Sequence, residues 1–411
     1  MTGRHNSPDE NNLWRLETPG ADGWPRTARP DDPGKFFMVS ADGHVQEPGD
    51  LWRTRIDRKY RDRLPGAAMD AKGNQYQKSE GFRPLRLRNV TFEGEDGLRN
   101  RSGRTPEERI EDLARDGVDA EVLFPNKGLT IWATPDPVFS QAMCRVYNDW
   151  AWETFGDFND RLSPMACVAP ADMEGAIAEI QRCAALGFRG LSLPCKPVWG
   201  APDHTHLNYN LPDCDPLWAA IEAVDLPVTF HVSTGRDPRT SRGNGGAVIN
   251  YAVHSLAPTM EPLANLCASG VLARFPGLRF GSVEAGIGWV PWALAAMDEA
   301  YLKHHMWVRP KLEMLPSEYF KRHGFATFQE DKAGLDLARE HGLMDNFMWA
   351  NDFPHHEGTW PHSSAAIERT MGQLSDGERA KILGLNAARV FGFEIPERYR
   401  NQADVAALTG S

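Results

Sequence analysis

Short apolar segments alternate with longer amphipathic segments along most of the chain. Thr105 is followed by Pro106 and two glutamates, a capping pattern that predicts a helix over 105–116. An apolar run at 120–124 follows it and has the length of a buried strand. The same alternation predicts further strands at 162–168, 188–193, 226–233, 278–284, 325–328 and 347–350. It predicts the intervening helices at 139–159, 173–186, 217–224, 261–274, 289–303, 332–341 and 363–391.

With an apolar run at 35–40 as the first strand, the chain has eight strands, each followed by helical sequence. Strands that alternate with helices are typical of a parallel sheet, and eight such units favour a closed (β/α)8 TIM barrel of class α/β. An open doubly wound sheet is the alternative. It lacks support because no Gly-x-Gly-x-x-Gly opens a helix after the first strand.

Three segments fall outside this alternation. Residues 1–34 are polar and rich in Gly, Pro, Asp and Asn, so we expect an N-terminal arm before the barrel of 35–395. Residues 51–104 contain short alternating pieces and predict an insertion that forms a small sheet or flap above the first strand. Residues 396–411 are a C-terminal tail.

Composition narrows the class of protein. Apolar residues at 41% and charged residues at 25% are ordinary for a globular protein, and a net charge of -11 argues against nucleic acid or an anionic membrane as the main partner. No apolar run approaches the ~18 residues of a membrane span, and no secretion signal is recognisable, so we expect a cytoplasmic protein. The six cysteines form no Cys-x-x-Cys pair, which favours reduced thiols over disulfides or a thiolate zinc site.

Metal-capable side chains stand at the ends of the predicted strands. They are Asp42, His44, His231, Glu284 and Asp352. In a barrel, the catalytic residues lie at the carboxyl ends of the strands. Residues two positions apart on a strand face the same side, so the side chains of Asp42 and His44 can both point into the mouth of the barrel. Two imidazoles with one or two carboxylates suit a divalent metal that keeps open positions.

Five segments carry a resemblance to a known family. They are Asp-Gly-His within 40–48, Phe-His at 230–231, Glu-Ala-Gly-Ile-Gly-Trp within 283–289, Asn-Asp-Phe-Pro-His-His within 351–361, and Asn-Ala-Ala-Arg within 386–392. Over residues 36–393 the chain resembles the amidohydrolase-related family that includes aminocarboxymuconate-semialdehyde decarboxylase and the resorcylate-type decarboxylases. The resemblance implies a metal-dependent barrel, usually with zinc or manganese, whose ligands are Asp42, His44, His231 and Asp352.

The chain departs from the family pattern at two positions. Many relatives have His-x-His at the first strand; here its first member is Asp42, a harder oxygen ligand that leans toward manganese or iron without excluding zinc. The decarboxylases place an acid/base histidine at the sixth strand, where this chain offers Ser282 and Glu284. We therefore consider Glu284 and His254 as the catalytic residues, with Glu284 either a general base or a ligand and His254 either catalytic or structural.

These residues leave three classes of function open. The first is a metal-dependent hydrolase or nonoxidative decarboxylase that acts on a small carboxylated or aromatic substrate. The arginines at 236, 239 and 242, in a loop, could hold the carboxylate of such a substrate. If Glu284 and His254 both bind metal, the second is a dinuclear, iron-containing oxygenase. The third is a structural partner of an active paralogue. We expect a homodimer or higher oligomer, or a hetero-oligomer in the third case.

Overall fold

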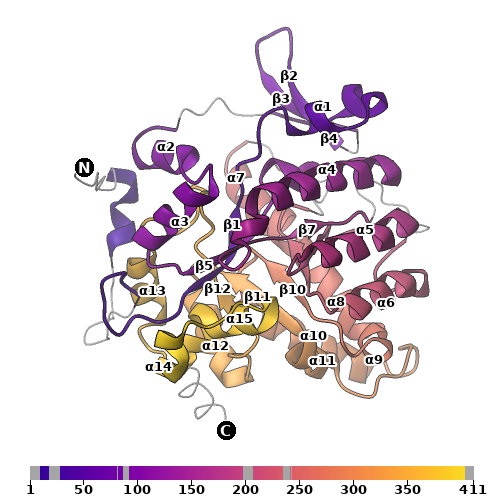
Figure 1. Cartoon of the computed structure of the whole chain (residues 1–411). Helices are drawn as coiled ribbons and strands as arrows, with labels where there is room; N and C mark the ends of the chain where they lie inside the picture. The colour runs from indigo at the N-terminus through magenta and orange to yellow at the C-terminus, as the bar shows by residue number, and fades with distance from the viewer. Residues whose placement is uncertain are drawn as a thin grey trace.

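The structure is a computed structural model that describes residues 10–17, 28–80, 82–86, 92–197, 207–234, 241 and 243–402. Eight short parallel strands lie at its centre, with helices around them (Figure 1). In barrel order the strands are β1 (Val39–His44), β5 (Ala120–Phe124), β6 (Leu162–Pro164) with its continuation β7 (Ala166–Cys167), β8 (Leu191–Leu193), β9 (Val228–His231), β10 (Phe280–Val283), β11 (Gly324–Phe328) and β12 (Phe347–Trp349).

Hydrogen bonds continue across both places where the strand ladder is interrupted. Between β6 and β7, the Met165 amide donates to the Leu123 carbonyl at 2.9 Å, and the next residue bonds to the following strand. Between β12 and β1, Gly43 and Phe353 form a parallel bridge, and the His44 amide donates to the Phe353 carbonyl at 2.7 Å. The strands therefore follow one another around a barrel, and the predicted (β/α)8 fold is confirmed.

Helices follow the strands in the expected alternation. The longer ones are α3 (Pro106–Arg115), α4 (Pro137–Phe155), α5 (Met173–Leu186), α6 (Asp215–Val224), α8 (Met260–Ala268), α10 (Trp289–Lys303), α11 (Pro316–His323), α12 (Lys332–His341) and α13 (Ser363–Met371). Shorter helical segments are α7 (Gly246–Ile249), the π-helix η6 (Asn250–Leu256), α9 (Val271–Arg274), α14 (Asp376–Ala380), the π-helix η8 (Lys381–Leu385) and α15 (Asn386–Phe391). As predicted, the Thr105 hydroxyl caps α3 by accepting from the Glu108 amide at 3.3 Å.

The first strand begins later than the sequence suggests. We predicted it at 35–40, but it spans 39–44 and includes the Asp-Gly-His motif. The preceding backbone is held by side chains instead of a strand ladder: the Met38 amide donates to Asp119 at 3.0 Å, and the Phe37 amide donates to Gln402 at 3.0 Å. The apolar residues before the motif are buried without being strand, which periodicity alone does not distinguish.

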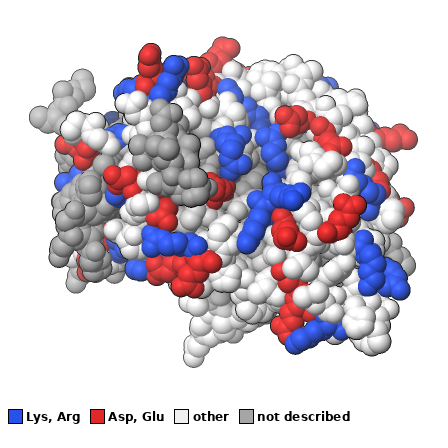
Figure 2. Space-filling view, turned by 90° about the horizontal axis from the view of Figure 1, so that it is seen from below, with Lys and Arg blue, Asp and Glu red and all other residues white. Residues whose placement is uncertain are grey.

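The segment between β1 and α3 follows the carboxyl end of the first strand and has secondary structure of its own. It contains α1 (Leu51–Arg55), a small antiparallel sheet of β2 (Gly66–Met69), β3 (Gln75–Ser79) and β4 (Phe82–Arg86), and α2 (Gly94–Arg101). Figure 1 shows this sheet projecting at the top of the molecule. On the face shown in Figure 2, basic and acidic side chains alternate in small groups, so this face has no large area of one sign.

Apolar side chains fill the inside of the barrel and the layer between strands and helices. The inner cluster joins residues of β1, β5, β10, β11 and β12 to Phe391, Phe393 and Tyr399 near the end of the chain. The C-terminal helical segment thus closes the end of the barrel where the strands begin. The opposite end, where the strands finish, is left for polar side chains.

A buried carboxylate joins the end of α3 to the start of α13, and it predicts a pH-dependent stability. Asp116 accepts bonds from the Ser363 amide at 3.0 Å and from the Ser363 hydroxyl, yet burial raises its pKa from 3.8 to about 7. Because the folded pKa is the higher one, the favourable contribution is complete below pH ~4 and is lost as the pH rises through 7.

We therefore compare Asp116→Asn with the wild type by urea unfolding between pH 4.5 and 7.5. The free energy of unfolding of the wild type should fall relative to that of the variant by up to about 1.4 kcal/mol per pH unit. A difference that stays constant over this range would mean that Asp116 is ionised throughout.

Candidate metal centre

The metal-capable residues predicted from the sequence meet where the strands end. Asp42 lies within β1 and His44 is its last residue, His231 is the last residue of β9, Glu284 directly follows β10, and Asp352 lies after β12. All five side chains are buried. Parallel strands bring their carboxyl ends to one rim of a barrel, which explains how residues more than 300 positions apart become neighbours.

Their donor atoms form one compact group. His231 Nε2 lies 3.4 Å from both Asp42 Oδ1 and Glu284 Oε2. His44 Nε2 lies 3.3 Å from Asp352 Oδ1, 3.6 Å from Asp42 Oδ1 and 3.8 Å from Glu284 Oε2. Ligand atoms of Asp42, His44, His231 and Glu284 all lie within 4.8 Å of one another.

The hydrogen bonds of the two histidines fix which nitrogen faces this group. His44 Nδ1 lies 2.8 Å from the Pro125 carbonyl, and His231 Nδ1 lies 2.9 Å from the Val232 carbonyl. A carbonyl oxygen only accepts, so both Nδ1 atoms carry the hydrogen and both Nε2 atoms direct a lone pair at the carboxylates. Backbone acceptors hold metal-binding histidines in this way.

Several carboxylate oxygens and an imidazole nitrogen of the cluster lack hydrogen-bond partners among the described residues. Asp42 Oδ2, His44 Nε2 and Asp352 Oδ2 have no hydrogen-bond partner in the described part of the chain, although all are buried. Burial and then the charges of Asp352 and Asp42 raise the pKa of Glu284 well above its usual range, while burial and then His355 lower the pKa of His44 well below its usual range. Buried lone pairs and crowded acids of this kind suit a divalent ion.

A second set of donors overlaps the first. It consists of His44, Glu284, Asp352 and His355. An imidazole nitrogen has one lone pair, so His44 Nε2 serves one ion. We therefore interpret the two overlapping sets as alternative ligands of one metal ion and not as two complete metal sites.

His355 is the histidine that the sequence did not single out. It was one of three histidines near Asp352, and the structure separates them: His356 contacts Glu357 and His362 contacts Glu95, whereas the His355 ring stacks on His44 with centroids 3.9 Å apart. Its Nδ1 lies 3.0 Å from Asp352 Oδ1. Burial lowers the pKa of His355, but the charge and contact of Asp352 outweigh it and raise that pKa to about 9.

A buried ion pair supports the two segments that carry the ligands. Arg109 Nε donates to Glu121 at 2.5 Å, and its two terminal nitrogens donate to the carbonyls of His44 at 2.7 Å and Phe353 at 2.9 Å. Arg109 thus joins β1 to the segment after β12. A Cβ on Gly43 would lie 2.1 Å from Glu121 Oε1, so only glycine fits between Asp42 and His44. No sequence pattern marks this pair, because Arg109 resembles any other arginine in a helix.

Two ligand candidates adopt a backbone conformation that non-glycine residues rarely take. Glu284 has φ 63° and Asp352 has φ 53°. The Glu284 amide donates to the Thr327 hydroxyl at 3.0 Å, and Asp331 accepts from the Ile287 and Gly288 amides at 2.8 and 2.6 Å. Left-handed backbone that is held by its surroundings clusters at functional sites.

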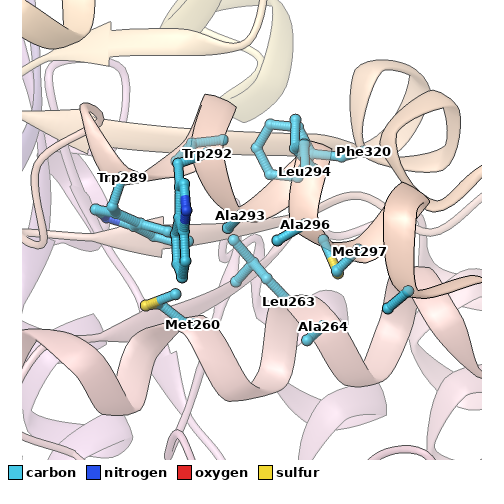
Figure 3. A pocket seen from close by; sticks show the side chains of 12 residues that line it. Met260, Leu263, Ala264, Trp289, Trp292, Ala293, Leu294, Ala296, Met297 and Phe320 are labelled. Atoms are coloured by element: carbon cyan, nitrogen blue, oxygen red, sulfur yellow. The ribbon is translucent and has the colours of Figure 1, made fainter.

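Four further residues were expected to take part in the site. His254 is buried on η6, but neither donor set of the described residues includes it, so its catalytic role stays a prediction. The loop arginines at 236, 239 and 242 lie outside the described residues. A groove between α8 and α10 is lined by apolar side chains such as Met260, Trp289 and Trp292, and therefore offers no acid, base or ligand (Figure 3).

Comparison with known proteins places this architecture in a family. The family model described as amidohydrolase matches residues 41–393, which include every residue of both donor sets. The chain belongs to the amidohydrolase family. This confirms the expected enzyme superfamily. None of the helices in the described residues combines the length and the apolar character of a transmembrane helix.

Relatives of this amidohydrolase include decarboxylases. A gamma-resorcylate decarboxylase from Rhodococcus jostii is 26% identical over 282 residues, covering 64% of this chain and 80% of the relative. Two solved structures share the fold. An amidohydrolase from Mycobacterium avium subsp. paratuberculosis has a TM-score of 0.67 at 18% identity, covering 88% of this chain and 99% of the other. A 5-carboxyvanillate decarboxylase from Novosphingobium aromaticivorans, with bound manganese, has a TM-score of 0.63 at 17% identity, covering 87% and 97%.

Proposed function

We propose that the chain is a nonoxidative decarboxylase of an aromatic carboxylic acid that uses one divalent metal ion. The observation that carries this proposal is the buried cluster of two imidazole nitrogens, both with lone pairs turned inward, among three carboxylates. The curated decarboxylase relatives support the reaction class over hydrolysis.

Asp42, His44, His231 and Asp352 would hold the ion. Two nitrogens and several carboxylate oxygens form a donor set that suits manganese, and a solved neighbour contains manganese. When bound, the metal supplies positive charge that orients an anionic substrate and neutralises the carboxylates. Zinc and iron bind the same donors. Manganese is the first metal to test because the solved neighbour contains it.

Glu284 is our candidate for the proton transfer. Nonoxidative decarboxylation breaks the bond between the ring and the carboxylate, releases carbon dioxide, and delivers a proton to the ring carbon. The donor must face the substrate from a dry position. Glu284 is 4% exposed, its Oε2 lies 3.4 Å from His231 Nε2, and its backbone amide donates to the Thr327 hydroxyl. His254 is the alternative donor from the sequence.

The reaction is tested with purified protein under nitrogen. With manganese and a panel of hydroxylated aromatic acids that includes gamma-resorcylate and 5-carboxyvanillate, we expect release of one carbon dioxide per acid consumed, measured by gas chromatography and by chromatography of the phenol. Chelation should abolish the release, and added manganese should restore it.

Two changes to this assay separate the competing functions. Hydrolysis of aromatic esters or amides added to the panel, without carbon dioxide release from the acids, would favour a hydrolase, and turnover that appears only when the assay is repeated in air would favour a dinuclear oxygenase. Activity that appears only with a second, homologous chain would favour the role of structural partner.

A further inference from the structure

A turn before the barrel reaches the loop that follows Asp352. The turn is the 3₁₀ segment η1 (Glu10–Leu16), which packs against α13, and it is the indigo segment at the left of Figure 1. Its Arg15 is 7% exposed. One terminal nitrogen of Arg15 donates to the Gly358 carbonyl at 2.7 Å, and the other donates to the His356 carbonyl at 2.6 Å.

The loop contacted by Arg15 belongs to the candidate metal centre. It runs over 355–362 and begins with His355, which stacks on His44 and contacts Asp352. Because carbonyls 356 and 358 lie one and three residues beyond His355, fixing them limits how far the His355 ring can move. Arg15 Nε also donates to Asn12 at 2.9 Å, which orients the guanidinium.

The same loop is held from its other side by α2. Arg99 donates to the Trp360 carbonyl at 2.7 Å and to the His356 carbonyl at 3.4 Å. Glu95 pairs with Arg99 and lies 2.9 Å from His362 Nε2. The His356 carbonyl therefore accepts from two arginines that belong to two different segments.

The turn is itself fastened to the barrel. Arg369 of α13 donates to the Glu17 carbonyl at 2.5 Å and pairs with Glu330 at 2.8 Å. Two guanidiniums contact the Trp14 ring, with Arg15 Cζ 4.9 Å and Arg369 Cζ 5.4 Å from its centroid. The segment that carries Arg15 is therefore itself held in place, which a residue that positions other groups requires.

We propose that Arg15 is a positioning residue of the metal centre: the turn 10–16 holds the loop 355–362 so that His355 stays against His44 and Asp352. The turn lies before residue 41, where the family match begins, so this support is added to the barrel from outside the matched region. The inference rests on the proposed metal site, and it assigns Arg15 no contact with the substrate.

The test compares Arg15→Ala and Arg15→Lys with the wild type by manganese titration, with free manganese followed by electron paramagnetic resonance. We expect Arg15→Ala to raise the dissociation constant for manganese about 10- to 100-fold, the range typical of groups that orient ligands. Arg15→Lys should fall between the two, because an ammonium lacks the planar fork that bonds two carbonyls at once. The signal of bound manganese should broaden in both variants as the ligand geometry becomes less uniform.

Arg55→Ala is the matched control, because it removes a surface arginine whose bond to Glu153 is remote from the loop. It should bind manganese as the wild type does. Thermal unfolding of the metal-free proteins separates the two roles: a purely stabilising Arg15 would lower the melting temperature while leaving manganese affinity unchanged, and that result overturns the inference. If Arg15→Ala does not fold, Arg15→Lys decides alone. If the wild type binds no manganese, the proposed metal site fails, which is a separate result.

Discussion

His231→Ala should lose both bound metal and decarboxylase activity while keeping its fold. Its Nε2 is one of the two nitrogen donors in the cluster, and the ring is held from behind by the Val232 carbonyl. Loss of a direct ligand should weaken manganese binding by more than the roughly 10- to 100-fold seen for groups that only orient ligands. Asp352→Ala should behave in the same way. Elemental analysis and carbon dioxide release measure the two losses.

His323→Ala is the matched control for this experiment. His323 also bonds a backbone carbonyl through Nδ1, at 3.0 Å from Leu278, but it lies where β11 begins, at the opposite end of the barrel. It should retain metal and activity. A His231→Ala protein that still binds one manganese per chain with wild-type affinity would remove His231 from the ligand set.

Arg109→Met should produce the largest loss of stability. Arg109 and Glu121 are both 0% exposed, so removing the guanidinium leaves a buried carboxylate without its cation. It also removes one donor from each of two carbonyls, those of His44 and Phe353, and the Phe353 carbonyl keeps the His44 amide. Breaking a buried pair on one side costs about 3 to 5 kcal/mol. Urea unfolding of the metal-free protein measures the change.

The double variant Arg109→Met/Glu121→Leu tests the reason for that loss. Because an apolar pair no longer buries an unpaired charge, it should recover part of the free energy of unfolding. Manganese affinity should be lower than that of the wild type in both the single and the double variant, since neither has Arg109 to join the carbonyls of His44 and Phe353. A single variant that loses less than about 1 kcal/mol would mean that solvent reaches Glu121.

Much of the barrel could be predicted because its signals are local. Thr105 and Pro106 mark a helix start, and the helices at Met173–Leu186, Trp289–Lys303 and Lys332–His341 have the bounds that the sequence suggested. The ligand candidates could also be predicted from the sequence, because a strand that ends in a metal-capable side chain places that side chain on the rim of the barrel.

The remaining features depend on distant contacts. Residues 36–38 are as apolar as a buried strand, and only the bonds to Asp119 and Gln402 show that β1 starts later. Choosing His355 among its neighbours requires knowing that its ring meets His44, and the roles of Arg15 and Arg109 depend on carbonyls that any residue carries. Sequence patterns describe side chains and not the backbone groups that these arginines bind.

The most direct test of the account is the number of manganese ions bound per chain at saturation. His44 Nε2 is common to both donor sets and serves one ion, so a titration of the metal-free protein should end at one manganese per chain. Two tightly bound ions per chain would contradict the single-metal decarboxylase and favour the dinuclear oxygenase. A protein that binds no manganese would contradict the metal centre itself.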